Sequence, residues 1–210
     1  MDTVTRPLWR FFDARSMGAA LDHARGGGIA VFRGSRWSLL GAGSGQRGVL
    51  LPFVDWAVRA VEAPRCRVLR KGPAKGFVRA PVLRASRHRV AEWVARDDDC
   101  PGTMAPFRFD CVRCAACCFG AEVVLEAADL TRFRAAGRPD LVRRTRGVPG
   151  ADWRVLPIVP ETRACVHLGG DHRCGIYVAR PTMCRDFLAG SEHCLTSREE
   201  KYGTAFPYGR

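Results

Sequence analysis

Cysteine is the residue type in this chain whose number and spacing point most directly to chemistry. Eight of the ten cysteines lie between residues 111 and 194, and the first four form a Cys-x-x-Cys-x-x-Cys-Cys run. Two intervening residues let successive thiols converge on one ion, and thiolates are preferred ligands of zinc and of iron–sulfur clusters. We therefore predict a metal site built from Cys111, Cys114, Cys117, Cys118, Cys165, Cys174, Cys184 and Cys194.

The adjacent pair Cys117 and Cys118 leaves the number of metal centres open. Neighbouring side chains point in different directions in most backbone conformations, so one thiol can close a first site while the other serves a second site or packs. Eight thiols can form one four-cysteine centre with four supporting residues, or two four-cysteine centres. Arg113, Arg180 and Arg185 are close to cysteines in the sequence and would offset the negative charge of the thiolates.

The remaining cysteines and the nearby histidines have weaker claims to a metal. Cys66 falls in a predicted strand and is expected to be a buried thiol, whereas Cys100 stays undecided between a ligand, a redox partner and neither. A mixed cysteine and histidine zinc site remains possible with His167, His172 or His193. Each of these histidines is expected instead at the surface or as a hydrogen-bond donor to a ligand.

The elements that must position the cysteines divide near residue 105. Residues 1–104 are predicted to form a small α+β module of unknown role, in which no catalytic set is visible. Its expected elements are a helix that Asp13 caps, a hairpin of residues 29–32 and 37–40, helical segments at 53–61 and 90–94, strands at 65–69 and 77–82, and a linker at 97–102.

Residues 105–210 are predicted to form a second module that the metal organises, so that the whole chain is α+β. We expect a strand at 123–125, a helix at 127–136 and a strand at 153–159. Pro181 fits the first turn of a helix whose amides would face the Cys184 sulfur. Glycine, arginine and loop residues dominate from Cys165 onward, and we therefore expect the metal to supply much of the folding free energy there.

Several blocks of the second module occur together in a known order. These are Phe109-x-Cys111-x-x-Cys114-x-x-Cys117-Cys118, Cys165-x-x-Leu168, and Cys174-x-Ile176-Tyr177-x-x-Arg180-Pro181-x-x-Cys184-Arg185-x-Phe187. The pattern resembles the YkgJ-type CxxCxxCC cysteine-cluster family, a zinc- or iron-chelating domain, over residues 109–195. It is also similar to bacterial flagellin lysine N-methylases, and that similarity implies an iron–sulfur centre, with [4Fe-4S] ahead of zinc, and a protein-modifying reaction.

Charge suggests a second class of partner. The formal net charge is +13, and 31 of the 34 basic residues are arginine. The densest basic stretch, residues 59–96, would suit a phosphate-binding face, although a solvated surface is the favoured interpretation because no nucleic-acid motif accompanies it. Nucleic acid is therefore a possible but less favoured partner.

A glycine-rich turn at 41–45 invites comparison with the loops that bind S-adenosylmethionine or nucleotides. The strand before it reads as the second arm of a hairpin, and a loop without a ligand is the favoured interpretation. This weakens the hypothesis of a SAM-dependent lysine N-methylase-like enzyme. Nothing in the sequence supports a hydrolase or a kinase.

The N-terminal sequence, the length of the apolar stretches and the many thiols together indicate a cellular compartment. No signal peptide is visible after Met1 and no apolar stretch reaches membrane-spanning length, so we expect a cytoplasmic protein whose thiols stay reduced. The leading hypothesis is a metal-binding cysteine-cluster protein with a redox or protein-modification role. The alternative is a structural-zinc interaction module whose basic half binds nucleic acid.

Overall fold

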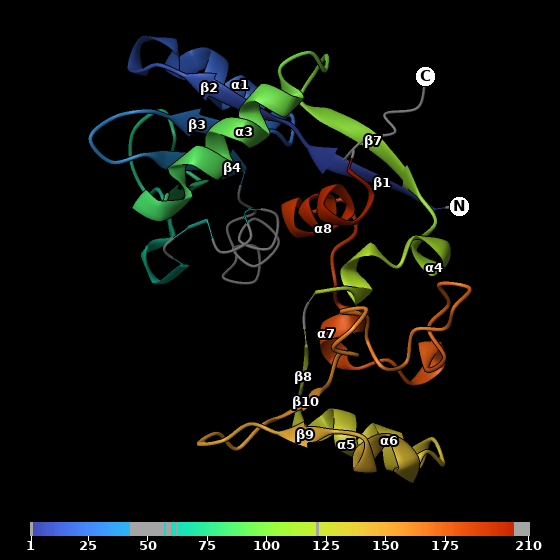
Figure 1. The fold of residues 1–210 in the computed structure, drawn as a ribbon. Helices are drawn as coiled ribbons and strands as arrows, with labels where there is room; N and C mark the ends of the chain where they lie inside the picture. The colour runs from blue at the N-terminus through green and yellow to red at the C-terminus, as the bar shows by residue number, and fades with distance from the viewer. Residues whose placement is uncertain (1, 43–56, 58–59, 62, 121, 204–210) are drawn as a thin grey trace. The chain divides into compact units, whose positions relative to one another are not determined.

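The computed structural model describes residues 2–42, 57, 60, 61, 63–120 and 122–203. The fold is mixed α+β, which confirms the predicted class (Figure 1). The chain divides into two compact units. Thr3–Phe107 form most of the N-terminal unit, and Arg108–Ala189 form most of the C-terminal unit. Gly190–His193 belong to the N-terminal unit, and the described residues from Cys194 onward belong to the C-terminal unit.

A five-stranded sheet forms the centre of the N-terminal unit, with the strand order β2-β3-β4-β6-β5. β2 and β3 are parallel, whereas the other neighbouring strands are antiparallel. A parallel pair needs a crossover connection, and α1 supplies it. The elements are β2 (Trp9–Phe12), α1 (Met17–Arg25), β3 (Ile29–Phe32), β4 (Ser38–Ala42), β5 (Arg67–Val68) and β6 (Phe77–Pro81).

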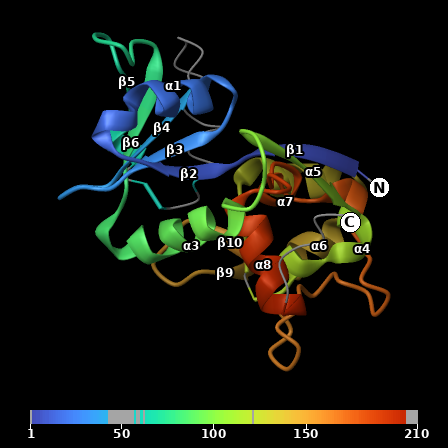
Figure 2. The ribbon, with the colours of Figure 1, turned by 90° about the horizontal axis from the view of Figure 1, so that it is seen from above.

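Two helices cover opposite faces of this sheet: α1 lies on one and α3 (Arg87–Asp97) on the other (Figure 2). Successive strand residues point to opposite faces. Accordingly, Ala30 packs in the core beside α1, whereas Val31 packs in the core beside α3. The latter core contains Trp9 and Trp93, whose ring centroids are 5.0 Å apart. The N-terminal unit therefore has apolar packing on both faces of its sheet.

The strongest local signals of this unit are confirmed. The side chain of Asp13 accepts a hydrogen bond from Ser16 N at 2.7 Å and so caps the turn that leads into α1. Gly27, with φ +93°, follows the helix in a conformation that side chains rarely adopt. β3 and β4 form the predicted hairpin, and α3 contains the predicted helical segment at 90–94.

Other expectations for the first half need correction. β1 (Asp2–Pro7) and β7 (Met104–Phe109) form a two-stranded sheet that the sequence did not predict. The strand expected at 65–69 is wrong in extent, because Ala63–Arg65 form a 3₁₀ turn before the two-residue strand β5. Much of the helix expected at 53–61 lies outside the described residues, including Phe53 and Trp56. Its described positions, Ala57, Ala60 and Val61, are buried.

A buried ion cluster lies within the N-terminal unit. Arg6 donates to Asp97 at 2.9 Å and to Glu192, the first residue of α8 (Glu192–Tyr202), at 2.6 Å. Arg96 binds the same Glu192 with both terminal nitrogens at 2.6 Å. Asp97 also accepts a hydrogen bond from Trp9 N at 3.0 Å. The charges of these two arginines and two carboxylates balance, which burial requires.

The C-terminal unit contains a small antiparallel sheet with the strand order β8-β10-β9. Phe133 and Leu141 are fully buried against it, and Ile176 and Ala179 complete the same core. The strand expected at 153–159 is shorter than predicted. The elements are β8 (Val123–Leu125), α5 (Ala127–Ala135), α6 (Pro139–Arg143), β9 (Arg146–Gly147) and β10 (Arg154–Leu156).

The rest of the C-terminal unit consists of short elements and loops. α4 (Cys111–Cys114) and α7 (Thr182–Arg185) have four residues each, and residues 157–181 contain only isolated bridges and the 3₁₀ turn Tyr177–Ala179. Pro181 directly precedes α7 and does not lie in its first turn, which corrects the prediction. Among the described residues, no helix has the length and apolar character needed to cross a membrane.

Candidate metal centre

The first three cysteines are positioned by two short helical turns. Asp110 caps α4 by accepting a hydrogen bond from Arg113 N at 3.2 Å. Ala115 then adopts a left-handed conformation, with φ 49°, and the chain turns into the 3₁₀ segment Ala116–Cys118. This reversal lets Cys111, Cys114 and Cys117 line one cavity.

A fourth thiol reaches this cavity from the far end of the domain sequence. Cys194, on α8, lines it together with Phe187, Ala189 and Arg198. The cavity volume is about 20 Å³, close to the space that one water molecule or ion occupies. We define the first cysteine group as Cys111, Cys114, Cys117 and Cys194.

Positive charge lies beside the first group. Arg198 Nη1 donates a hydrogen bond to the sulfur of Cys114 at 2.9 Å. One turn later on the same helix, the hydroxyl of Tyr202 donates to the backbone carbonyl of Cys114. The amine of Lys201 lies 3.5 Å from the ring centre of Phe119. Of these contacts, the one from Arg198 reaches a sulfur and can stabilise thiolate charge at the first group.

The second cysteine group consists of Cys118, Cys165, Cys174 and Cys184. Cys165 N donates to the backbone carbonyl of Cys118 at 2.8 Å, which fixes the first two side by side. Burial, together with the negative charges of the other three thiols, raises the pKa of the Cys184 thiol to about 12. The four thiols are therefore electrostatic neighbours.

Backbone amides point at two sulfurs of the second group. Burial raises the pKa values of Cys165 and Cys174, and the backbone N–H two residues later, from His167 and from Ile176, opposes that shift by hydrogen bonding to the sulfur. Such N–H to sulfur bonds favour thiolates, the form that binds metal. Leu168 and Cys174 form an isolated β-bridge that closes the loop between these two cysteines.

Cys117 and Cys118 form the boundary between the two groups. The Cys117 thiol donates a hydrogen bond to Cys118, which raises the pKa of Cys117 and lowers that of Cys118. The charges of Cys111 and Cys194 also act on Cys117, whereas those of the second group act on one another. Adjacent residues thus face different sets of thiols.

α7 carries Cys184, and a buried carboxylate holds this helix in place. Asp129, in the first turn of α5, accepts hydrogen bonds from both the backbone N–H and the hydroxyl of Thr182 at 2.8 Å. It also accepts from Glu126 N at 3.0 Å and forms an ion pair with Arg132 at 2.8 Å. Asp129 therefore links the core of the C-terminal unit to the second group.

All ten cysteines are described, and none forms a disulfide. The eight predicted ligands fall into the two groups and are half-buried. In the part of the chain that the structure describes, no three cysteine, histidine, aspartate or glutamate side chains are close enough to hold a common ion. The thiols of each group therefore lie in one region of the structure, but they do not converge on a single point.

The two remaining cysteines and the three histidines considered above belong to neither cysteine group. The sequence predicts a buried strand residue at Cys66, but Cys66 is half-buried and directly precedes β5. It packs against the core of the N-terminal unit, where burial raises its pKa. The Cys100 carbonyl accepts a hydrogen bond from Arg10 in the same unit. His167 is buried, His172 lies 6.0 Å from the Phe119 ring, and His193 is in the N-terminal unit.

The sequence reasoning missed Arg198 and Asp129. Arg198 follows Cys194 by four residues on one helix, a spacing that places two side chains on the same face. Glu126 and Asp129 have the spacing of a helix cap, which would have placed Asp129 in a first helical turn. Neither signal predicts the distant partner, which is Cys114 for Arg198 and Thr182 for Asp129.

Comparison with known proteins agrees with the cysteine pattern. Residues 110–203 match the CxxCxxCC family model, described as a "Putative zinc- or iron-chelating domain". No curated protein and no solved structure matched the chain. The matched segment contains all eight cysteines of the two groups and the helices α4, α7 and α8. Residues 110–203 are therefore a CxxCxxCC domain, in a family regarded as zinc- or iron-chelating.

Proposed function

We propose that the C-terminal module, predicted as residues 105–210, binds two four-cysteine metal centres, one for each cysteine group, and that each is a [4Fe-4S] cluster. The division of the eight thiols into two sets of four carries this proposal. Four thiolates are a complete ligand set for such a cluster. The N–H to sulfur bonds at Cys165 and Cys174 and the Arg198 bond to Cys114 fit the surroundings of metal-bound thiolates.

The charges near the two groups support a redox role. A [4Fe-4S]²⁺ cluster with four thiolates carries a net charge of about −2, and reduction adds one more negative charge. Arg198 beside the first group, and Arg180, whose charge lowers the pKa of Cys118 and Cys174, favour the more negative state. Both clusters would therefore accept an electron more readily than they would without these cations. The free state of all ten cysteines fits a cytoplasmic protein.

Matched cysteine variants test the two-centre proposal. Iron, sulfide and zinc per chain would be measured in anaerobically purified wild-type protein and in the variants Cys114→Ser, Cys184→Ser and both together. Each single variant should lose about half of the metal and the double variant nearly all, whereas Cys66→Ser should keep the wild-type content. Loss of all metal in both single variants would indicate one shared centre and would refute the proposal. Unchanged metal content in either single variant would also refute it.

A structural-zinc module is the second candidate, and the size of the first cavity favours it. About 20 Å³ has room for one ion, so a cluster would require the first group to open. Tetrahedral four-cysteine zinc sites are closed and stabilise folds without redox chemistry. A colourless anaerobic preparation with about one or two zinc ions per chain and no sulfide would establish this candidate. A brown preparation with broad absorption that dithionite bleaches would establish iron–sulfur.

Protein modification by S-adenosylmethionine has less support. β4, which contains Gly41, pairs antiparallel with both of its neighbours, β3 and β6. Glycine turns that bind such cofactors follow a parallel strand. Residues 43–45 of the glycine-rich turn lie outside the described residues.

A further inference from the structure

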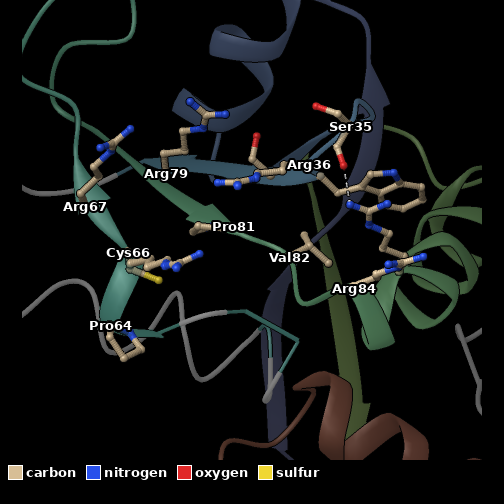
Figure 3. A pocket seen from close by; sticks show the side chains of 13 residues that line it. Ser35, Arg36, Pro64, Cys66, Arg67, Arg79, Pro81, Val82 and Arg84 are labelled. Carbon is tan, nitrogen blue, oxygen red and sulfur yellow. Dashed lines mark hydrogen bonds between the residues drawn. The ribbon is translucent and has the colours of Figure 1, made fainter.

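The N-terminal unit contains a cavity of about 820 Å³ at the edge of its sheet (Figure 3). This volume is in the range of small-molecule sites. β6 and the turns before β4 and before β5 contribute to its wall, together with the start of α3. Six of the described residues that line it are arginines: Arg36, Arg65, Arg67, Arg79, Arg84 and Arg87.

The charge around this cavity is one-sided. None of the described lining residues is acidic. Within the part of the chain that the structure describes, Arg36, Arg67, Arg79 and Arg84 also have no carboxylate partner. By contrast, the buried Arg6 of the same unit binds two carboxylates. These four arginines are exposed and solvated, and their combined positive potential would attract an anion into the cavity.

Two of these arginines are direct neighbours across the sheet. Arg67 of β5 is opposite Arg79 of β6 in the antiparallel register, and directly opposed residues share one face. Figure 3 shows both side chains on neighbouring strands at the same side of the cavity. Like charges in this position repel each other and destabilise the pair. A phosphate group between the two guanidinium groups would reverse this effect, because arginine binds phosphate oxygens in a bidentate fashion.

The indole ring of Trp37 is held in place at another part of the cavity wall. Trp37 lines the cavity and is held edge-on against Phe11, with ring centroids 5.6 Å apart. The guanidinium groups of Arg33 and Arg87 lie 5.6 Å and 5.9 Å from the centre of the same ring, and Arg87 donates to the carbonyl of Ser35 at 2.7 Å. A planar base that takes the place of one of these guanidinium groups would stack on this half-buried, oriented indole. The cavity thus combines phosphate-binding and base-stacking groups.

We propose that this cavity binds a phosphorylated ligand of nucleotide size, with its phosphates at Arg67, Arg79 and Arg36 and its base near Trp37. The volume, the one-sided charge and the fixed ring support a compact ligand more than a long nucleic-acid chain. This site lies wholly in the N-terminal unit and does not depend on the metal centres.

Binding to the full-length protein would be measured by titration calorimetry. ATP and tripolyphosphate are the probes, adenosine is the control without phosphate, and a single-stranded oligonucleotide is the competing class. ATP and tripolyphosphate should both bind, and adenosine should not. Binding of adenosine as tight as that of ATP, binding of the oligonucleotide alone, or absence of binding by ATP and tripolyphosphate would overturn the proposal.

Charge-matched variants localise the binding. Arg67→Gln combined with Arg79→Gln should weaken ATP binding at least about 10-fold, because two charge-assisted contacts are lost. The control combines Arg15→Gln with Arg89→Gln, which are exposed, belong to the same unit and do not line the cavity. It should change binding by less than about 2-fold. Equal weakening in both double variants would show attraction to net charge alone and would refute the site.

Trp37→Leu separates the base from the phosphates. It should weaken ATP binding several-fold and leave tripolyphosphate binding near the wild-type value. Equal loss for both probes, in protein with wild-type circular dichroism, would contradict the assignment of the base to Trp37.

Discussion

Arg198 Nη1 lies 2.9 Å from the sulfur of Cys114, although 84 residues separate the two in the chain. Arg198 follows Cys194 by four residues on α8, so this one helix brings both a thiol and a cation to the first cysteine group. An arginine at this position lowers the cost of thiolate charge in a half-buried cavity.

Replacement of this arginine tests its role at the metal. Arg198→Gln should reduce metal affinity at the first group by about 10- to 100-fold, because hydrogen bonds to ligands are lost with effects of that size. Competition with a chelator measures the affinity. Glu200→Gln, an exposed change on the same helix, is the control and should leave affinity unchanged. Equal affinities of Arg198→Gln and wild type would show that the contact does not support metal binding.

Asp129 should be among the most sensitive positions of the C-terminal unit. Asp129→Ala removes the acceptor for both donors of Thr182 and leaves them unpaired, which should cost about 2–4 kcal/mol of unfolding free energy. Denaturant unfolding measures the loss. Because Thr182 begins α7, the variant should also bind less metal at the second group. Asp152→Ala, at an exposed position, is the matched control. Wild-type stability of Asp129→Ala would contradict this account.

The candidate site was predictable in its residue types and less so in its grouping. The local spacing of Cys111, Cys114 and Cys117 is enough to predict that they are metal ligands. The assignment of Cys117 and Cys118 to different groups depends on Cys194 and Cys165, which only the tertiary fold brings near. The same holds for Arg198 and Asp129, whose partners are distant in the sequence.

The fold shows a similar division between local and distant signals. Asp13 and the turn at Gly34 are local signals, and both elements that they predict are present. β1 and β7 pair across about a hundred residues, and each contains a proline, which weakens a strand signal. The metal-organised character of residues 165–194 stays a prediction.

The buried ion cluster should respond strongly to loss of one partner. Asp97→Ala removes a carboxylate that Arg6 and Trp9 N both use. It leaves Arg6 and Arg96 to share the single negative charge of Glu192. The expected cost is about 3–5 kcal/mol of unfolding free energy. Asp98→Ala, next in sequence and 76% exposed, should change stability little and serves as the control. Similar unfolding midpoints for both variants would refute a structural role of the cluster.

His23 should make the N-terminal unit sensitive to mild acid. Burial lowers the pKa of this side chain, which lies 2.9 Å from the Leu8 carbonyl, with Arg10 as the nearby cation and the Phe12 ring at 5.5 Å. The unfolded chain then binds more protons than the folded one below the ordinary histidine pKa of about 6.5. Stability is complete above that pH and falls as pH drops below it. Urea unfolding between about pH 5 and 8 should show a shallower pH dependence in His23→Gln, and equal slopes would exclude His23 as the cause.

Removal of metal should release the C-terminal loops before the N-terminal sheet. Residues 157–181 contain Cys165 and Cys174 and are held by turns and isolated bridges without an α-helix or a strand, whereas the N-terminal unit is packed on both faces of its sheet. Under reducing conditions with a chelator, trypsin should cut first after the exposed Arg163 and Arg173, and only later after Arg89 in α3. Mass spectrometry of timed samples identifies the cuts, and the metal-loaded protein is the control. If cleavage after Arg163 and Arg173 proceeds equally fast with and without metal, the apolar core around Phe133 holds these loops without help from a metal.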